Sequence, residues 1–338
     1  MIAMRQDKAK RSEKVTATEG RQSEAPALSA IVVIPDTYDT VRNTMKHLQA
    51  QTTARQIEIV IVKPTRLQID LDESDLEPFH SWQIVEVEEV SSIGQGFTAG
   101  IRKARAPIVA LTEDHSYPDE RWAELFIAAH KQPCAVVGPR MCNGNPGSML
   151  SWADFYQAYG EWTHPVSPGP VRHLPGHNSS YKRDIILAFG NELETLMEAE
   201  SVLHRHLRAK GYELYLESGT CTSHLNFDTW SAWIPARYYT GRQFASTWAH
   251  SWSWPRRLLF TAASPLIPWV RLWRVQSRVR RGQTTEFLLR LLPIMLSGLL
   301  VEGVGHMLGY AAGAGDASEK VGRYEFHRIR KQTEQAVK

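Results

Sequence analysis

The chain contains little cysteine. Only Cys134, Cys142 and Cys221 occur among its 338 residues, which is too few and too scattered for a disulfide framework or a cysteine-rich zinc site. This usage is typical of a protein in a reducing compartment. The first 27 residues carry six basic side chains but lack the apolar segment that a secretory signal requires. We therefore interpret residues 1–27 as a flexible polar tail and expect a cytoplasmic protein.

Acidic side chains are missing from one long segment. Residues 229–285 contain no Asp, Glu or Lys but nine Arg, so the rest of the chain carries a net charge of −6, although the whole chain stands at +3. An overall charge this small gives no reason to expect nucleic acid as a partner. The arginine-rich segment by itself predicts contact with an anionic surface.

Uncharged apolar runs long enough to cross a bilayer, about 20 residues, are also missing. The stretch 258–270 offers thirteen uncharged residues, and in 287–310 only eleven fit between Arg290 and Glu302. Seven of the eleven Trp lie within the arginine-rich segment, and Trp and Arg are enriched where proteins meet lipid headgroups. We predict interfacial or re-entrant helices on the cytoplasmic membrane face, with a true span or an ordinary buried helical subdomain as alternatives.

Short apolar runs alternate with longer amphipathic ones from residue 29 onward. The short runs predict strands at 29–34, 57–62, 82–87, 108–111, 135–138 and 212–216. The longer runs predict helices at 98–104, 121–130, 150–162 and 192–210. This rhythm is typical of an α/β protein with a mostly parallel, Rossmann-like sheet flanked by helices. Because the composition changes near residue 225, we expect an α/β domain over 28–225 and an apolar, Arg- and Trp-rich helical region over 226–338.

Two acids and an imidazole follow the strand at 108–111. In an open α/β sheet, ligands bind beyond the carboxyl ends of the strands, which is where Glu113, Asp114 and His115 stand. Carboxylate oxygens and a histidine nitrogen can hold Mg²⁺ or Mn²⁺ against a diphosphate. The alternative is a polar turn in which Asp114 or Ser116 caps the next helix.

A second candidate group lies on the helix predicted at 192–210. Glu200 and His204 are four residues apart and share a face, while Glu198 points elsewhere. A carboxylate there can act as a general base toward an acceptor hydroxyl, although solvated helix acids are common. Zinc binding by Glu200, His204 and His206 is disfavoured because residues two apart face different sides of a helix.

Three further segments are candidates for ligand contacts. His224 follows a predicted strand and completes either a metal or phosphate site or a purely structural contact. The loop 174–183, which contains Asn178, is rich in donors suited to sugar hydroxyls or phosphate, and is otherwise a surface loop. The glycines at 94, 96 and 100 do not follow the first strand, so binding of a nicotinamide or flavin dinucleotide is not expected.

Taken in their order along the chain, these strands and motifs resemble those of glycosyltransferase family 2. The members of that family are inverting enzymes with a GT-A fold that use nucleotide-diphospho-sugars. The resemblance runs from about residue 28 to 224. It aligns 35–39 with the turn that contacts the nucleoside, 96–104 with the segment before the metal motif, and 111–118 with the acidic metal motif itself. It also aligns 176–183 with the loop near donor sugar and acceptor.

The resemblance implies roles for particular residues. Residues implied to contact the donor are Pro35, Asp39, Thr98, Glu113, Asp114 and Asn178. The metal ligands would be Glu113, His115 and His224. Glu200 would be the base, with Glu198 as the alternative. Lys63 to Arg66 replace a run of Asp-Asp-Gly-Ser whose first acid helps hold uracil in the family, and Thr98 replaces an Asn. Since His115 stands where the family has a carboxylate, the site has less negative charge and admits softer ions such as Mn²⁺.

The resemblance therefore implies an enzyme that transfers a sugar with inversion to an acceptor hydroxyl, and the Arg- and Trp-rich region points to a lipid-linked or cell-envelope glycan acceptor. The main alternative is a membrane-associated binding or scaffold protein that keeps the fold without catalysis. A nucleotidyltransferase is disfavoured, since residues 35–38 do not form a glycine-rich phosphate loop.

Overall fold

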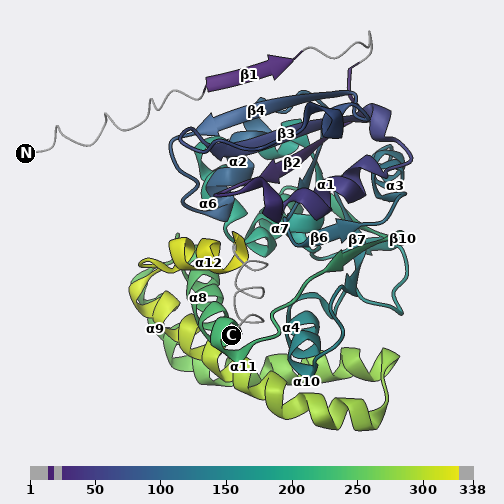
Figure 1. The fold of residues 1–338 in the computed structure, drawn as a ribbon. Coiled ribbons are helices and arrows are strands. Elements are labelled where there is room, and N and C mark those ends of the chain that lie inside the picture. The colour runs from purple at the N-terminus through teal and green to yellow at the C-terminus, as the bar shows by residue number, and fades with distance from the viewer. Residues whose placement is uncertain (1–13, 19–24, 327–338) are drawn as a thin grey trace, which may run out of the picture.

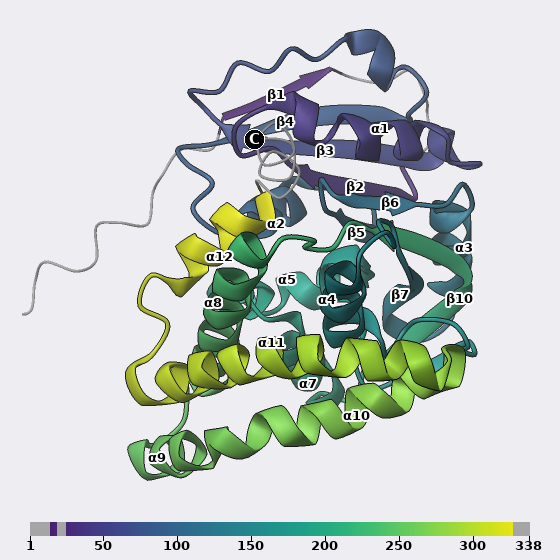
Figure 2. The same cartoon turned by 60° about the horizontal axis from the view of Figure 1, so that its bottom comes forward.

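A computed structural model describes residues 14–18 and 25–326 of the chain (Figure 1). These residues form one ten-stranded sheet, helices packed against it, and a layer of long C-terminal helices beneath its edge (Figures 1 and 2). The expected α/β class and the C-terminal helical region are both confirmed.

The strands run in the spatial order β1-β4-β3-β2-β5-β9-β7-β10-β6, with β8 paired to β10. Neighbours from β4 to β5 are parallel, as are β7 and β10, whereas β9 lies antiparallel between β5 and β7. The bounds are β1 Lys14–Thr18, β2 Leu28–Val33, β3 Ile57–Pro64, β4 Ser81–Val87, β5 Ile108–Thr112, β6 Ser116–Pro118, β7 Cys134–Asn143, β8 Gly169–Val171, β9 Ser180–Lys182 and β10 Glu213–His224.

The central strands form because most of their residues are apolar on both faces. Every residue of β2, β3 and β5 is buried, so helices cover both sides of the sheet there. The helices are α1 Arg42–Gln49, α2 Ile93–Lys103, α3 Trp122–Ala129, α4 Met149–Tyr159, α5 Arg183–Leu187, α6 Leu193–Met197, α7 Glu200–Ala209, α8 Trp230–Trp248, α9 Trp254–Ala263, α10 Ile267–Gly282, α11 Thr285–Ala312 and α12 Ala317–Phe326.

Two expectations about the chain are wrong in detail. Residues 14–18, assigned to the flexible tail, form the edge strand β1 antiparallel to β4. The single helix expected at 192–210 is two helices, α6 and α7, because Ala199 adopts a non-helical conformation (φ −149°, ψ 85°) between them. This break reorients the acids on either side of it.

The C-terminal helices pack around a buried carboxylate. The side chain of Glu302, in the middle of α11, forms ion pairs with Arg237 of α8 and Arg271 of α10. By length and composition, α11 is the helix among the described residues that is apolar enough to cross a membrane, and 39% of its most apolar window is buried within the protein. Its central charge therefore joins three helices to one another.

The Glu302 cluster predicts a pH-dependent stability. Burial would raise the pKa of Glu302, but the charges of Arg237 and Arg271 outweigh it and lower the pKa to about 2. Because this value lies below that of an unfolded glutamate, the stabilisation is present above about pH 4.5 and is lost as the pH falls toward 2. Glu302→Gln should lower the free energy of unfolding at pH 7 by about 3 kcal/mol.

Urea denaturation of both proteins between pH 3.5 and 7 measures this effect. The difference in the free energy of unfolding between the unsubstituted protein and Glu302→Gln should narrow below pH 4.5. Glu286→Gln is the matched control, because Glu286 is an exposed acid of the same helix that pairs with Arg290 and should contribute less than about 0.5 kcal/mol. Equal losses in the two variants would show that the buried cluster has no special role.

Candidate active site

Three side chains from two distant segments of the chain meet beyond the carboxyl end of β5. Glu113 and His115 follow β5 directly, and His224 is the last residue of β10, whose pairing with β6 sets it opposite Ser116. Their potential ligand atoms all lie within 4.8 Å of one another. Oε2 of Glu113 is 3.6 Å from Nε2 of His224 and 4.0 Å from Nε2 of His115. The structure thus brings together the three residues expected to bind metal.

Both imidazoles are held by their Nδ1 atoms. Nδ1 of His115 donates to Oδ1 of Asp114 at 2.5 Å, and Nδ1 of His224 donates to Oδ1 of Asn226 at 3.0 Å. In each ring the Nε2 atom faces Glu113. Hydrogen bonds of this kind orient histidine ligands in metal sites. One carboxylate and two oriented imidazoles fit a divalent first-row cation such as Mn²⁺ better than Mg²⁺.

A fourth side chain, which is an acid, approaches the same site from the C-terminal helix. Oε2 of Glu325, on α12, lies 3.5 Å from Nε2 of His115. Sequence reasoning missed this residue, because nothing in the segment 317–326 indicates that it folds back over the sheet. The carboxylate of Glu325 adds a second oxygen donor beside the three predicted ligands.

His177 joins the candidate metal site to the candidate base. Its Nε2 is 2.5 Å from Oε1 of Glu200, and its Nδ1 is 3.6 Å from Oε1 of Glu113. Burial would lower the pKa of His177, but Glu200 and Glu113 raise it well above its usual value. Burial would in turn raise the pKa of Glu113, but His115, His177 and His224 hold it well below its usual range. An imidazolium therefore bridges two carboxylates.

The loop that carries His177 is shaped by its neighbours. This turn, η4 Gly176–Asn178, packs so tightly on α7 that a Cβ at position 176 would lie 2.2 Å from Cβ of Glu200. Any side chain there would displace Glu200. Nδ2 of Asn178 donates to Oε2 of Glu113 at 2.7 Å, so the structure gives Asn178 the task of holding Glu113. The sequence of this loop predicts many hydrogen-bond donors but gives no signal for the role of His177.

These groups open into one cleft of about 250 Å³. Glu113, His177, Glu200 and His224 all line it. Glu198 lines it too, with Oε1 accepting from the backbone N–H of Gly94 at 3.2 Å. The expectation that Glu198 points elsewhere is wrong, because the chain breaks between α6 and α7. Glu198 and Glu200 therefore both line the cleft that Glu113 and His224 reach.

His204 turns away from this cleft. It is fully buried, and its ring accepts from the backbone N–H of Leu174 at 3.4 Å and lies 3.1 Å from the hydroxyl of Tyr181. Burial lowers the pKa of His204 to about 3. Although Glu200 and His204 are four residues apart on one helix, only Glu200 lines the cleft, and His204 is a structural residue.

A larger cleft of about 620 Å³ lies at the ends of β2, β3 and β4. Pro35 lines it as expected, together with Asp36, Pro64 and Arg66, and α12 forms its other wall. Asp39 does not line it. The η1 turn, Tyr38–Thr40, directs the Asp39 side chain outward, where it is 77% exposed and pairs with Arg42 at 2.9 Å.

Two other residues expected at the donor differ from their predicted roles. Thr98 is buried within α2 and lines neither cleft, since α2 begins at Ile93 and places this position against the sheet. Asp114 is buried as well, and its Oδ1 atom holds His115. It therefore acts as a support for a predicted ligand, whereas Glu113 faces the cleft.

No protein-family model matches the chain. No curated protein matches it either. Among solved structures, it is similar to the mannosyltransferase PcManGT from Pyrobaculum calidifontis in complex with GDP-Man and Mn²⁺, with 14% identity, coverage of 88% of this chain and 90% of that one, and a TM-score of 0.49. It is also similar to S. aureus TarS in complex with UDP, with 14% identity, coverage of 83% and 90%, and a TM-score of 0.44. These values are too low to transfer a function, so the site's own geometry must support one.

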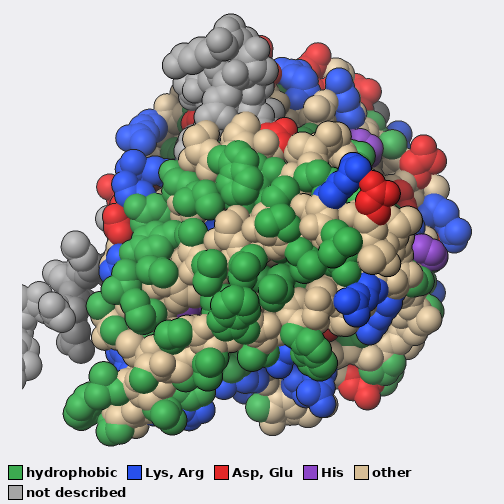
Figure 3. Space-filling model, turned by 90° about the horizontal axis from the view of Figure 1, so that it is seen from below, with side chains coloured by type: hydrophobic (Ala, Val, Ile, Leu, Met, Phe, Trp, Pro, Cys, Tyr) green, Lys and Arg blue, Asp and Glu red, His purple; other side chains and the backbone are tan. Residues whose placement is uncertain are grey.

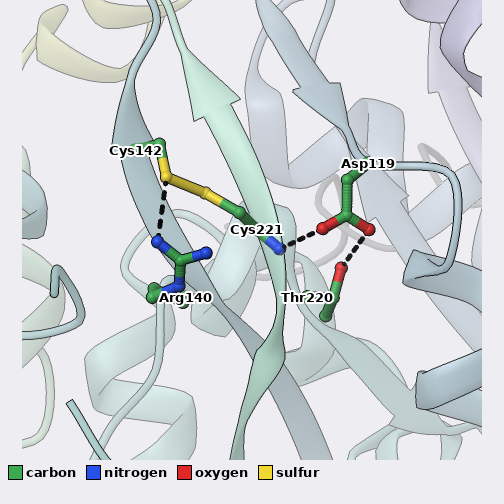
Figure 4. The surroundings of a disulfide bond; sticks show 5 residues. All are labelled: Asp119, Arg140, Cys142, Thr220 and Cys221. Carbon is green, nitrogen blue, oxygen red and sulfur yellow. Dashed lines mark hydrogen bonds between the residues drawn. A yellow bond between two sulfur atoms is a disulfide. The ribbon is translucent and has the colours of Figure 1, made fainter. Parts of the chain in front are cut away.

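A disulfide lies on the strands that lead to this site. Cys142 of β7 and Cys221 of β10 are bonded, 79 residues apart in sequence (Figure 4). The backbone N–H of Cys221 donates to Asp119 at 2.7 Å. The few, scattered cysteines gave no reason to expect this bond, which the parallel pairing of β7 with β10 makes possible by bringing the two positions together. The bond removes the support that the cysteine content gave to a reducing compartment. Cys134 is buried and free.

The disulfide predicts a definite thiol count. Protein purified without reductant and then denatured should react with one equivalent of a thiol reagent, at Cys134, and with three after reduction. Replacing both Cys142 and Cys221 by Ser should lower the free energy of unfolding by about 2–4 kcal/mol, since the bond closes a long loop. Cys134→Ser is the control, because this variant should show no reactive thiol before reduction and two after it. Three reactive thiols in the unreduced protein would contradict the pairing.

Proposed function

We propose that this chain is an inverting glycosyltransferase that moves a sugar from a nucleotide-diphospho-sugar to an acceptor hydroxyl. One observation carries the proposal: Glu113 and His224, two members of the donor set that His115 completes, line the same cleft as Glu200, and His177 bridges Glu113 and Glu200. A cation site beside an oriented carboxylate supplies the two groups that such a displacement needs, namely compensation for a departing diphosphate and a base.

The reaction is a single in-line displacement. The acceptor oxygen attacks the anomeric carbon and forms the new bond, while the bond from that carbon to the diphosphate oxygen breaks on the opposite face. Glu200 receives the acceptor proton, and His177 holds its Oε1 atom so that Oε2 can face the acceptor. A divalent cation held by Glu113, His115 and His224 would offset the negative charge of the diphosphate.

The larger cleft suits the nucleoside diphosphate. Pro35 and Arg66 line it from the strand ends, and Arg323 lines it from α12. Lys63, which replaces an acid that would help hold uracil, is buried and paired with Glu86 at 2.8 Å. The proposal therefore does not specify uridine as the nucleoside. Since α12 lines both clefts, it must lie beside the bound donor.

A screen of nucleotide sugars tests the activity. Purified full-length protein with Mn²⁺ is incubated with uridine, guanosine and thymidine diphosphate sugars, and mass spectrometry detects release of the nucleotide. We expect at least one donor to be consumed, and consumption to stop when EDTA removes the metal. Binding of a donor without any release of nucleotide would support a scaffold protein instead and would overturn the proposal.

The acceptor and the location complete the proposal. We place the enzyme at the cytoplasmic face of a membrane, acting on a lipid-linked or cell-envelope glycan acceptor. The support is that α8 and α4 of the helical side contribute Gln243, Thr240 and Ala158 to the smaller cleft, so an acceptor held near these helices can reach Glu200.

A further inference from the structure

The outer side of α9 and α10 is apolar and exposed. These helices, with the short turn Ser264–Leu266 between them, lie along the bottom of the molecule in Figure 1, and Figure 3 shows hydrophobic side chains gathered across that face. We define the α9–α10 face by its large exposed side chains, which are 47–69% exposed: Trp254, Leu258, Leu259, Leu266, Trp269, Val270 and Trp273.

The spacing of these residues shows that they form a surface of their own. Leu266, Trp269, Val270 and Trp273 are three and four residues apart and so lie on one side of the helix. Val275 and Val279 of α10 are fully buried in the core, on the side that packs against α11. The helix therefore already has a packed side, and its tryptophans form a second, unshielded one. Monomeric soluble proteins rarely expose a contiguous patch of this kind.

The arginines of α10 divide into two groups. Arg271 and Arg278 turn inward and pair with Glu302 and Glu161. Arg274, Arg280 and Arg281 of α10 are exposed. Residues 229–285 contain no acid that could neutralise the exposed group. A surface of tryptophan and leucine bordered by arginine is complementary to an apolar layer with negative charge at its border.

We infer that the α9–α10 face binds an anionic lipid bilayer. The tryptophans and leucines enter the boundary between headgroups and acyl chains, and the exposed arginines contact lipid phosphates. Because Glu302 ties α11 to α8 and α10 inside the protein, α11 stays within the folded body, and the chain lies on the membrane without crossing it. This inference does not depend on the proposed activity, since vesicle binding needs no substrate.

Sedimentation with lipid vesicles tests the inference. The full chain is mixed with vesicles of phosphatidylcholine alone or with 30% phosphatidylglycerol, at 0.1 M and 0.5 M NaCl. We expect binding to the anionic vesicles at low salt, at least 10-fold weaker binding to phosphatidylcholine alone, and release at high salt. Tryptophan fluorescence should shift to the blue as the protein binds.

Two pairs of substitutions separate the apolar and charged contributions. Trp269→Ser with Trp273→Ser should weaken binding to anionic vesicles about 10-fold or more. Arg280→Ala with Arg281→Ala should weaken it by roughly 5-fold for each arginine and reduce its salt dependence. Trp230→Ser is the matched control, because Trp230 is also half-exposed but lies at the start of α8, outside this face. This variant should bind anionic vesicles as tightly as the unsubstituted protein.

Several outcomes would overturn the inference. One is failure of the full chain to sediment with anionic vesicles at low salt. Another is binding of the Trp269 and Trp273 double variant to anionic vesicles as tightly as the unsubstituted protein. A third is light scattering that shows a dimer which the same double substitution dissociates, because the face would then be an interface between two copies. Circular dichroism confirms that each variant is folded, and since all the substituted side chains are exposed, folding should be retained.

Discussion

Glu200→Gln is expected to lower kcat at least 10²-fold while leaving the affinity for the nucleotide sugar nearly unchanged. Glutamine keeps the size of the side chain and can still bond to His177, but it cannot accept the acceptor proton. Loss of a general base typically costs about 10²–10⁴ in rate. Initial rates at saturating donor, together with calorimetric titration of the donor, separate the effect on kcat from that on binding.

Glu198→Gln is the matched control for this prediction. Glu198 lines the same cleft, but its two carboxylate oxygens accept from Gly94 and Gln243, and burial raises its pKa. We expect this variant to keep most of the activity, because its hydrogen bonds make Glu198 a support for the start of α2. An active Glu200→Gln enzyme alongside an inactive Glu198→Gln enzyme would reverse the two roles.

His224→Ala is expected to weaken Mn²⁺ binding about 10²-fold and to lower activity by a similar or larger factor. Removing even a group that orients a ligand typically costs 10–100-fold in metal affinity, and here a ligand itself is removed. The loss leaves Glu113 and His115 as the remaining predicted ligands from the sheet edge. Electron paramagnetic resonance of free Mn²⁺ measures the affinity without any substrate.

The control for the metal site is His250→Ala. His250 is exposed just beyond the end of α8, and its substitution should change neither Mn²⁺ affinity nor activity. Asp114→Asn is a graded test, since it preserves the size of the group that holds Nδ1 of His115 and should cost about 10-fold in affinity. Unchanged Mn²⁺ binding in His224→Ala would refute this donor set.

Local sequence pattern predicted much of the sheet and part of the site. Runs of Val and Ile that are apolar on both faces can only be buried strands, so β2, β3 and β5 were predictable within a few residues. The polar residues that end β5 were predicted to reach the ligand-binding edge, and Glu113 and His115 do so. For His224 and Glu200 the local pattern left structural alternatives open, and the resemblance to glycosyltransferase family 2 was needed to favour their roles as metal ligand and base.

Other features of the site depend on how distant segments meet. The chain break at Ala199 brings Glu198 into the cleft, and the η1 turn directs Asp39 away from it. Pairing of β7 with β10 joins Cys142 to Cys221. The roles of His177 and Glu325 arise from contacts across 23 and 210 residues of chain, to Glu200 and His115 respectively. Pattern within a window of ten residues contains no information about such contacts.

The amino-acid sequence by itself determined the alternation of strands and helices, the polar end of β5, and the segregation of arginine and tryptophan into residues 229–285, because burial and charge act on each segment locally. Only the tertiary structure decided which acids share a cleft, which histidine bridges them, and which arginines face outward. Those outcomes depend on the directions in which packed elements present their side chains, and these directions are set by the whole core.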